Sequence, residues 1–227
     1  MNRHQRDLFP KLDTSPSDLW GFEREALRKG FQNIAGVDEV GRGPLAGPVV
    51  SAAVILPSSF SQSGVTDSKK LTPKKRDYFF DMIYDQARSI GLGIVDPIEI
   101  DRINILQASL LSMSIAIENL HPQPDFLLID GIFQVASHLP QKPITKGDSR
   151  SRSIAAASIV AKVTRDRLMD RYHVDYPDFG FDRHKGYPTR AHKEAILRHG
   201  VCPIHRRSFK GVILSHDLTQ SLPQGPC

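Results

Sequence analysis

Four acidic residues stand at positions where short apolar runs of the chain end. Asp38 and Glu39 close one such run, Asp130 follows a second, and Asp148 precedes a helix-like segment of small residues. Enzymes commonly place catalytic side chains at rigid strand ends. Carboxylates without cysteine or zinc-spaced histidine nearby select hard cations such as Mg²⁺ or Mn²⁺. Two such ions about 4 Å apart support in-line displacement at a phosphodiester, so the acids predict a metal-dependent site of that kind.

Two features of these acids leave their assignment open at this level. Neighbouring side chains on a strand point to opposite faces, so Asp38 and Glu39 share one site only if the strand twists or ends between them. The chain holds 25 acidic residues, and four of them at element ends also fit ordinary surface acids. Further acids are rival ligands that would replace Asp148 in an alternative set: Asp101, Asp166 and Asp170.

A turn with the sequence Gly41-Arg42-Gly43 follows directly after the first acid pair. Glycine has no Cβ, so such a turn lets another molecule approach the backbone closely. Arg42 has two candidate roles, a contact to a phosphate or an ion pair that braces the turn against a carboxylate. The segment therefore predicts a binding surface beside the acidic site.

The composition narrows the class of protein. The chain has 227 residues, of which 40% are hydrophobic and 24% charged, as is ordinary for one globular domain with a small appendage. The formal charge of +5 fits a polyanionic partner without requiring one. Cys202 and Cys227 are the only cysteines and indicate no disulfide framework. The longest uncharged apolar stretch is shorter than the about 20 residues of a membrane span, and we expect a cytoplasmic protein with no membrane partner.

Hydrophobic periodicity and turn residues predict how the chain is organised. Strands are expected over residues 33–40, 48–56, 91–95, 126–129 and 143–146, and helices over 18–29, 72–89, 97–101, 105–120, 154–172 and 189–199. Residues 176–188 are expected to form a loop. This order favours an α/β fold with a mixed sheet and helices on its faces. We expect an N-terminal extension with a short helix (1–30), a catalytic domain (31–210) and a C-terminal tail (211–227).

Several segments together resemble the signature of type 2 ribonucleases H, specifically the bacterial ribonuclease HII family. They occur in the order of that family between about residues 33 and 210, and they are Gly36–Val50, Asp67–Leu71, Ile129–Gly131, Lys146–Asp148, Ile154–Asp166, His184–Tyr187 and Ile204–Phe209. The arginine in the turn favours this family over the related ribonuclease HIII, whose turn lacks it. Residues 1–30 and those after 210 lie outside the resemblance.

The resemblance implies a ribonuclease H-like fold, with a mixed five-stranded sheet flanked by helices. It implies hydrolysis of the RNA strand of RNA/DNA hybrids, and incision 5′ to single ribonucleotides embedded in duplex DNA. The products would carry 3′-hydroxyl and 5′-phosphate ends, and two Mg²⁺ or Mn²⁺ ions would act in the complex. The four-carboxylate site of the family falls on Asp38, Glu39, Asp130 and Asp148. Recognition of the ribose 2′-hydroxyl falls on the following residues: Gly41, Arg42, Gly43 and Tyr187.

Contacts to the nucleic-acid backbone are expected from four basic residues, which are Lys69, Lys146, Lys185 and Arg206. Other basic side chains fit phosphate contacts, local salt bridges or a solvated face equally well, and these are Lys70, Lys74, Lys75, Arg76, His184 and Arg207. His205 is interpreted as structural, because no second ligand stands at zinc spacing from it.

The expected partners are RNA/DNA hybrids and DNA duplexes that contain ribonucleotides, bound by a monomer. Gln5-Arg6-Asp7-Leu8-Phe9 has the glutamine and apolar anchor of a sliding-clamp peptide, although such short motifs recur by chance. Two other functions stay open from the residues alone. One is a basic module that binds hybrid duplexes without cutting them, which has no need of four placed carboxylates. The other is a DNA-only nuclease such as a junction resolvase, which has no 2′-hydroxyl to test.

Overall fold

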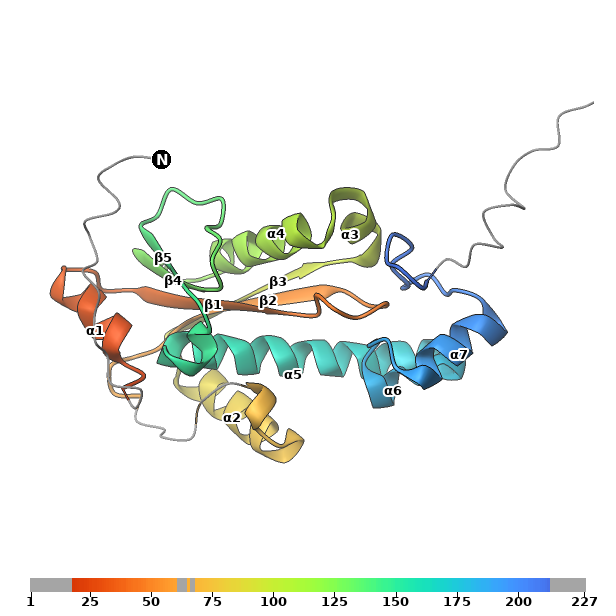
Figure 1. The fold of residues 1–227 in the computed structure, drawn as a ribbon. Coiled ribbons are helices and arrows are strands. Elements are labelled where there is room, and N and C mark those ends of the chain that lie inside the picture. The colour runs from red at the N-terminus through yellow and green to blue at the C-terminus, as the bar shows by residue number, and fades with distance from the viewer. Residues whose placement is uncertain (1–17, 61–64, 66–67, 213–227) are drawn as a thin grey trace, which may run out of the picture.

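A mixed five-stranded sheet forms the centre of the protein in the computed structural model, which describes residues 18–60, 65 and 68–212 (Figure 1). The strands are β1 (Ile34–Val40), β2 (Val49–Ile55), β3 (Ser89–Val95), β4 (Phe126–Asp130) and β5 (Gln141–Ile144). Their order in the sheet is β3-β2-β1-β4-β5. β1 pairs with β2 in antiparallel and with β4 in parallel fashion, β3 is antiparallel to β2, and β5 is parallel to β4. The predicted fold class is confirmed.

Helices cover both faces of this sheet (Figure 1). One face carries α5 (Arg152–Asp175) with α2 (Pro73–Gln86) beside it, and the other carries α4 (Ile105–Glu118) with α3 (Pro97–Ile103). α1 (Gly21–Arg28) lies near the start of β1, while α6 (Phe181–His184) and α7 (Arg190–His199) lie around the far end of α5. Short 3₁₀ turns occupy Ser68–Lys70, Gly147–Ser149 and Pro177–Phe179.

Alternation along the strands produces a separate core on each face. On β2, Ala52 and Val54 pack with α5 and α2, whereas Ala53 and Ile55 pack with α4. Every residue of β2 is buried, as its continuous apolar sequence predicts for a strand covered on both sides. A third core joins the far half of α5 to α6, α7 and the loop after β1, through Leu45, Met169, Phe181 and Ile196.

α5 lies unusually close to β1 because neither surface carries a large side chain at the contact. Residues 155–157 of the helix are alanines, and all are fully buried. A Cβ at Gly36 would overlap the backbone of Ser153 and Ile154. Glycine at this position therefore sets the distance between the first turn of α5 and the strand that leads to the acid pair.

α1 is fastened to the same end of α5 through a buried carboxylate. Glu23 Oε1 accepts hydrogen bonds from Ser151 Oγ at 2.7 Å and from the Ser153 N–H at 2.9 Å. Both donors lie at the N-terminus of α5, whose first N–H groups need acceptors. Phe22 and Ala26 complete the contact by packing into a core with β1 and β4. The N-terminal helix is thus part of the packed body.

Several predicted boundaries differ from the structure by two or three residues, and three of the differences have a clear cause. α2 ends at Gln86 and not near residue 89, because Ser89 already pairs with Ile55 as the first residue of β3. β5 lies two residues earlier than predicted, and Lys146 in left-handed conformation follows its end. The predicted loop 176–188 contains α6, a single turn too short to show periodicity. None of the helices in the described residues combines the length and apolar character of a membrane span.

We predict that Gly36→Ala destabilises the protein by at least about 2 kcal/mol, because the added methyl forces α5 away from β1. Gly43→Ala is the matched control, since a Cβ there meets only Tyr187 Cε1 at an ordinary 3.7 Å. Urea unfolding of both variants checks this expectation. Equal unfolding midpoints would contradict the close contact.

Candidate active site

Three of the predicted acids converge at one end of the sheet. Asp38 and Glu39 lie on β1, Asp130 ends β4, and one carboxylate oxygen from each lies within 4.8 Å of the others. Among the described residues this is the single group of acid, histidine or cysteine side chains with such metal-like spacing. The convergence follows from the parallel pairing of β1 with β4, which brings both carboxyl ends to the same edge.

The end of a strand pairing explains how two neighbouring residues share this site. On the β2 side, β1 stays paired through Val40, but on the β4 side its pairing stops at Val37 with Ile129. Asp38 and Glu39 therefore lie beyond the last β4 contact, where the strand has a free edge. Their carboxylates meet at this edge, although their Cβ atoms start on opposite faces.

Asp148 adjoins the group without belonging to its tightest part. It is buried in the 3₁₀ turn after β5, and the preceding Gly147 donates its N–H to Asp130 Oδ1 at 2.6 Å. A Cβ at Gly147 would lie 2.6 Å from Ile154 Cδ1 and 3.2 Å from Asp130 Oδ1, so a larger residue there would require these side chains to shift. Lys69 Nζ lies 3.9 Å from Asp148 Oδ2 at the rim of the site.

The electrostatics of the site favour a bound cation. Burial raises the pKa of Asp38 well above its usual value, and the charges of Glu39, Asp130 and Asp148 raise it further. Burial also raises the pKa of Glu39, against the opposing effect of Arg42. The main groups acting on Asp38 include no cationic side chain. An oxygen-only donor set whose repulsion is only partly relieved by Arg42 fits a hard divalent cation, which would offset the rest of that repulsion.

Two serines that the sequence analysis missed connect this site to a flanking loop. Ser158 on α5 hydrogen-bonds Asp38 and thereby lowers its pKa. The Ser158 hydroxyl lies 2.9 Å from that of Ser68, and both residues are buried. A serine within the apolar run of α5 was the available signal, because a buried hydroxyl needs a partner. The pair ties Asp38 to the loop that carries Lys69.

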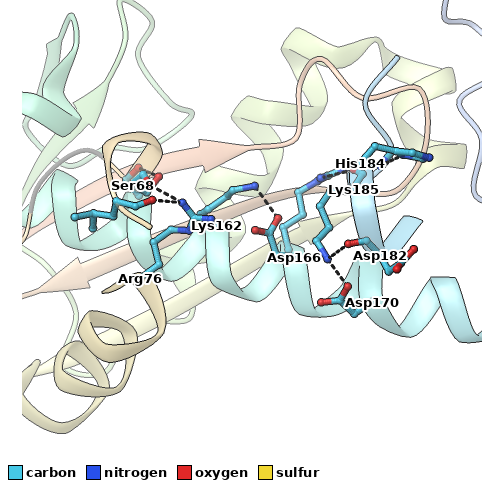
Figure 2. Close-up of polar contacts among 12 residues, drawn as sticks. Ser68, Arg76, Lys162, Asp166, Asp170, Asp182, His184 and Lys185 are labelled. Carbon is cyan, nitrogen blue, oxygen red and sulfur yellow. Dashed lines mark hydrogen bonds and ion pairs between the residues drawn. The ribbon is translucent and has the colours of Figure 1, made fainter. Parts of the chain in front are cut away.

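The three rival acids are occupied elsewhere. Asp166 pairs with Lys162 at 2.7 Å, and Asp170 pairs with Lys185, as Figure 2 shows. Asp101 accepts the backbone N–H groups of residues 207 and 208 at 2.8 and 2.9 Å. None of the three belongs to the metal-like group of the described residues.

The Gly41–Gly43 turn is held from beneath by a buried arginine. Arg206 is fully buried, and its guanidinium donates to the carbonyls of Gly41 at 2.6 Å, Gly47 at 2.9 Å and Arg42 at 3.2 Å. The predicted contact of Arg206 to the nucleic-acid backbone is therefore corrected. Its side chain is an internal support, because all of its guanidinium nitrogens are directed at protein carbonyls.

A second buried arginine, also missed from the sequence, supports the rest of the same loop. Arg165 on α5 donates to the carbonyls of Pro48 at 2.9 Å, Lys185 at 3.0 Å and Ala46 at 3.1 Å. Burial lowers the pKa of Arg165 to about 10 and that of Arg206 to about 9, so both remain charged at neutral pH. The backbone from residue 41 to 48 is thus fixed by two cations that bind carbonyl oxygens.

Tyr187 lies beside this turn, and Arg42 is its central residue. Tyr187 is 39% exposed, and its Cε1 atom lies 3.7 Å from the position that a Cβ would take at Gly43. Arg42 is exposed, with its Nη1 atom 3.4 Å from Glu39 Oε1. Of the two candidate roles of Arg42, the structure shows the ion pair with a carboxylate, that of Glu39. It also shows the partly exposed Tyr187 ring beside Gly43.

The remaining basic residues divide into exposed and internal groups. Lys69 and Lys146 are exposed near Asp148, as a contact to an external phosphate requires. Lys185 is only 19% exposed at its side chain, where it pairs with Asp170 and donates to the Asp182 carbonyl at 2.8 Å (Figure 2). The structure shows a local ion pair for Lys185, and the predicted phosphate contact stays a prediction.

Arg76 and three histidines serve the loops around the site. Arg76 donates to the carbonyls of Ser68 and Leu71, which shapes the loop of Lys69 (Figure 2). His192 and His205 are buried, with Nε2 atoms 3.1 Å apart, and the ring of His184 stacks on that of His192. The interpretation of His205 as structural agrees with this packing.

Comparison with known proteins identifies the same region of the chain. Residues 35–212 match the family model described as ribonuclease HII. A relative named ribonuclease HII from Geobacter sp. (strain M21) is 55% identical over 205 residues, which cover 90% of this chain and 89% of the relative.

Two solved structures are also similar. The ribonuclease H2 from Pyrococcus horikoshii OT3 superposes with a TM-score of 0.67 at 28% identity, covering 80% of this chain and 95% of that one. The PCNA:RNase HII complex from Archaeoglobus fulgidus contains a chain that superposes with a TM-score of 0.66 at 25% identity, covering 79% and 96%.

We predict that Arg206→Met destabilises the protein by about 3 kcal/mol or more, because three buried carbonyls lose their donor. Arg207→Met is the matched control, since Arg207 is the exposed neighbour. Chemical denaturation of both variants, at equal salt, measures the difference. Similar stability of the two variants would show that the turn does not depend on the buried guanidinium.

We predict that the protein loses stability between pH 7 and pH 5 through its buried histidines. Burial lowers the pKa of His192 and His205 to about 4 in the folded protein. In the unfolded chain each titrates near 6.5, so only the unfolded state gains these protons at pH 5, at a cost to folding of about 2 kcal/mol per histidine. Urea unfolding at both pH values checks this. His192→Gln should shrink the pH-dependent loss, and an unchanged loss would contradict the assignment.

Proposed function

The chain belongs to the ribonuclease HII family and is a metal-dependent hydrolase of the ribonuclease H type, and we propose that it acts on two substrates. It hydrolyses the RNA strand of RNA/DNA hybrids, and it incises duplex DNA on the 5′ side of single embedded ribonucleotides. The products carry 3′-hydroxyl and 5′-phosphate ends. Such incision would begin the excision repair of ribonucleotides in DNA.

The observation that carries this proposal is the junction of an acidic site with an open backbone turn. Glu39 belongs to the carboxylate group and is contacted by Arg42, the central residue of the turn. Gly43 of the same turn adjoins the exposed Tyr187 ring. A sugar bound against the turn and the tyrosine would therefore have its phosphate beside the acids, which joins recognition to cleavage.

Recognition would use the one group by which RNA differs from DNA. Gly41, Arg42 and Gly43 supply backbone donors and acceptors to the ribose 2′-hydroxyl, and Arg206 keeps two of their carbonyls in place. The Tyr187 ring packs against the deoxyribose of the following nucleotide, where an extra hydroxyl would be unwelcome. This arrangement favours the junction from RNA to DNA.

Cleavage would depend on cations held by the acid group. Asp38, Glu39, Asp130 and Asp148 would hold two Mg²⁺ or Mn²⁺ ions, for which their oxygen donors are suited. Such ions, when bound, lower the pKa of an attacking water and stabilise charge at the leaving 3′-oxygen. The chain itself orients the acids: the Ser158 hydroxyl holds Asp38, and the Gly147 N–H holds Asp130.

Basic side chains around the site would add contacts to the phosphates of the duplex. Lys69 and Lys146 are exposed beside Asp148 and would bind phosphates.

We propose a catalytic domain over residues 31–210, with α1 packed onto it, acting as a cytoplasmic monomer. The Archaeoglobus fulgidus relative is in a complex with PCNA, which supports a sliding-clamp contact for this chain also. The proposed segment for that contact, Gln5–Phe9, lies outside the described residues.

We predict that Asp130→Asn reduces cleavage to below about 1% of wild type, because an amide cannot replace an anionic ligand. The substrate is a DNA duplex with one ribonucleotide, in Mg²⁺, and EDTA should stop the wild-type reaction. Asp81→Asn, at an exposed acid of α2, is the control and should cut normally. Binding of the duplex by Asp130→Asn should persist. Near-normal cutting by this variant, or a wild-type nick in EDTA, would refute the proposed chemistry.

We predict that Tyr187→Ala lowers kcat/KM at a single embedded ribonucleotide by about tenfold or more, through loss of a ring contact. Its unfolding midpoint should stay near that of wild type, because the ring is partly exposed. Tyr84→Ala is the matched control, since Tyr84 is 45% exposed on α2, away from the turn. Equal rates for the two variants would remove Tyr187 from recognition.

A further inference from the structure

Two buried histidines form a directed chain of hydrogen bonds that ends at the backbone of Tyr187. His192 Nδ1 lies 2.9 Å from the Tyr187 carbonyl oxygen, which can only accept, so His192 carries its proton on Nδ1. Its Nε2 atom is then an acceptor, and His205 Nε2 donates to it across 3.1 Å. His205 Nδ1 in turn accepts the Cys202 N–H at 3.0 Å. Each ring is neutral, and each has one tautomer.

The segment that carries His205 also fixes the recognition turn. His205 forms an antiparallel bridge with Ala46, and the Arg206 N–H donates to the Leu45 carbonyl at 2.9 Å. The Arg206 side chain holds the carbonyls of Gly41 and Arg42. One short segment, residues 204–206, therefore contacts the turn directly and reaches Tyr187 through His192.

The backbone before Tyr187 needs external support to keep its shape. Lys185 has a φ of 50°, in the left-handed region that side-chain-bearing residues seldom adopt, and Gly186 has a φ of 84°. This segment gains support from Arg165, which donates to the Lys185 carbonyl, and from the Leu45 N–H, which donates to that of Gly186 at 2.8 Å. The carbonyl of Tyr187 itself depends on His192 and on the Thr189 N–H.

We propose that His192 and His205 are positioning residues for substrate discrimination, because they set the distance between the Gly41–Gly43 turn and the Tyr187 ring. The inference rests on the proposed role of Tyr187 at the sugar. The histidines touch neither substrate nor the acids. They act by holding the Tyr187 carbonyl at a fixed distance from residues 204–206, which hold the turn. The width of the gap between the turn and the Tyr187 ring, where the sugar would bind, therefore follows from their hydrogen bonds.

The test compares two substrates and two substitutions at one position. The substrates are identical DNA duplexes, one with a single ribonucleotide and one with a run of four. His192→Asn keeps an amide donor near the place of Nδ1, whereas His192→Gln reaches only the place of Nε2. We expect His192→Gln to lower the preference for the single-ribonucleotide duplex, as a ratio of kcat/KM values, by about tenfold, and His192→Asn to retain most of it.

A double-mutant cycle with Tyr187→Ala separates positioning from loss of stability. If the histidine acts through the tyrosine, His192→Gln changes the ratio little once Tyr187 is alanine. Equal losses on both substrates, or effects that multiply in the double variant, would overturn the proposal. His205→Leu is the second variant, since it removes the donor to His192 without altering α7. Failure of the wild type to cut the single-ribonucleotide duplex would instead refute the proposed function.

Discussion

Two buried guanidinium groups hold the part of the chain that we propose for recognition of the sugar. Residues 41–48 connect β1 to β2 with an irregular backbone, so neither the sheet nor a helix satisfies the carbonyls of this loop. Arg206 donates to three of these carbonyls, and Arg165 donates to two of them and to the carbonyl of Lys185. A guanidinium has five N–H donors and keeps its charge when buried, which a lysine would not do as readily. Because the two arginines hold one face of the Gly41–Gly43 turn, its other face can stay open to a ligand.

The acid site differs from this loop, because it brings together carboxylates that repel one another, whereas the loop carbonyls attract the two arginines. Burial and mutual charge raise the pKa of Asp38, and this is opposed by hydrogen bonds from the Ser158 hydroxyl and from the Glu39 N–H at 2.8 Å. Rigid contacts hold the acids together despite their repulsion. They are the Gly36 contact to α5, the pairing of β1 with both β2 and β4, and the hydrogen bond from the Gly147 N–H to Asp130. A site of this kind is less stable than an apolar end of the same sheet, and it gains from a bound cation.

Local sequence patterns predict most of the fold but only part of the candidate site. Apolar runs placed the strands within about two residues, and the resemblance to ribonuclease HII named the acids. The sharing of one site by Asp38 and Glu39 was not predictable, because it depends on where the neighbouring β4 stops. The sequence predicts a nucleic-acid contact for Arg206, because nothing near it in the chain reveals that carbonyls 159 and 165 residues away need donors. Ser158 and Arg165 were missed for the same reason: their partners are distant in the chain.

α5 connects the acids to the recognition turn within one element. Its first half meets β1 and Asp38, and its second half carries Arg165 and Met169, which pack under the loop and beside Gly186. A displacement of this helix would therefore disturb the acid group and the Gly41–Gly43 turn together, to which we assign cutting and sugar discrimination. Under the proposed function, damage to this helix would give an inactive protein and not one that cuts ordinary DNA. If the protein incises DNA at ribonucleotides as proposed, this linkage is a safeguard, because a loss of sugar discrimination also removes cleavage.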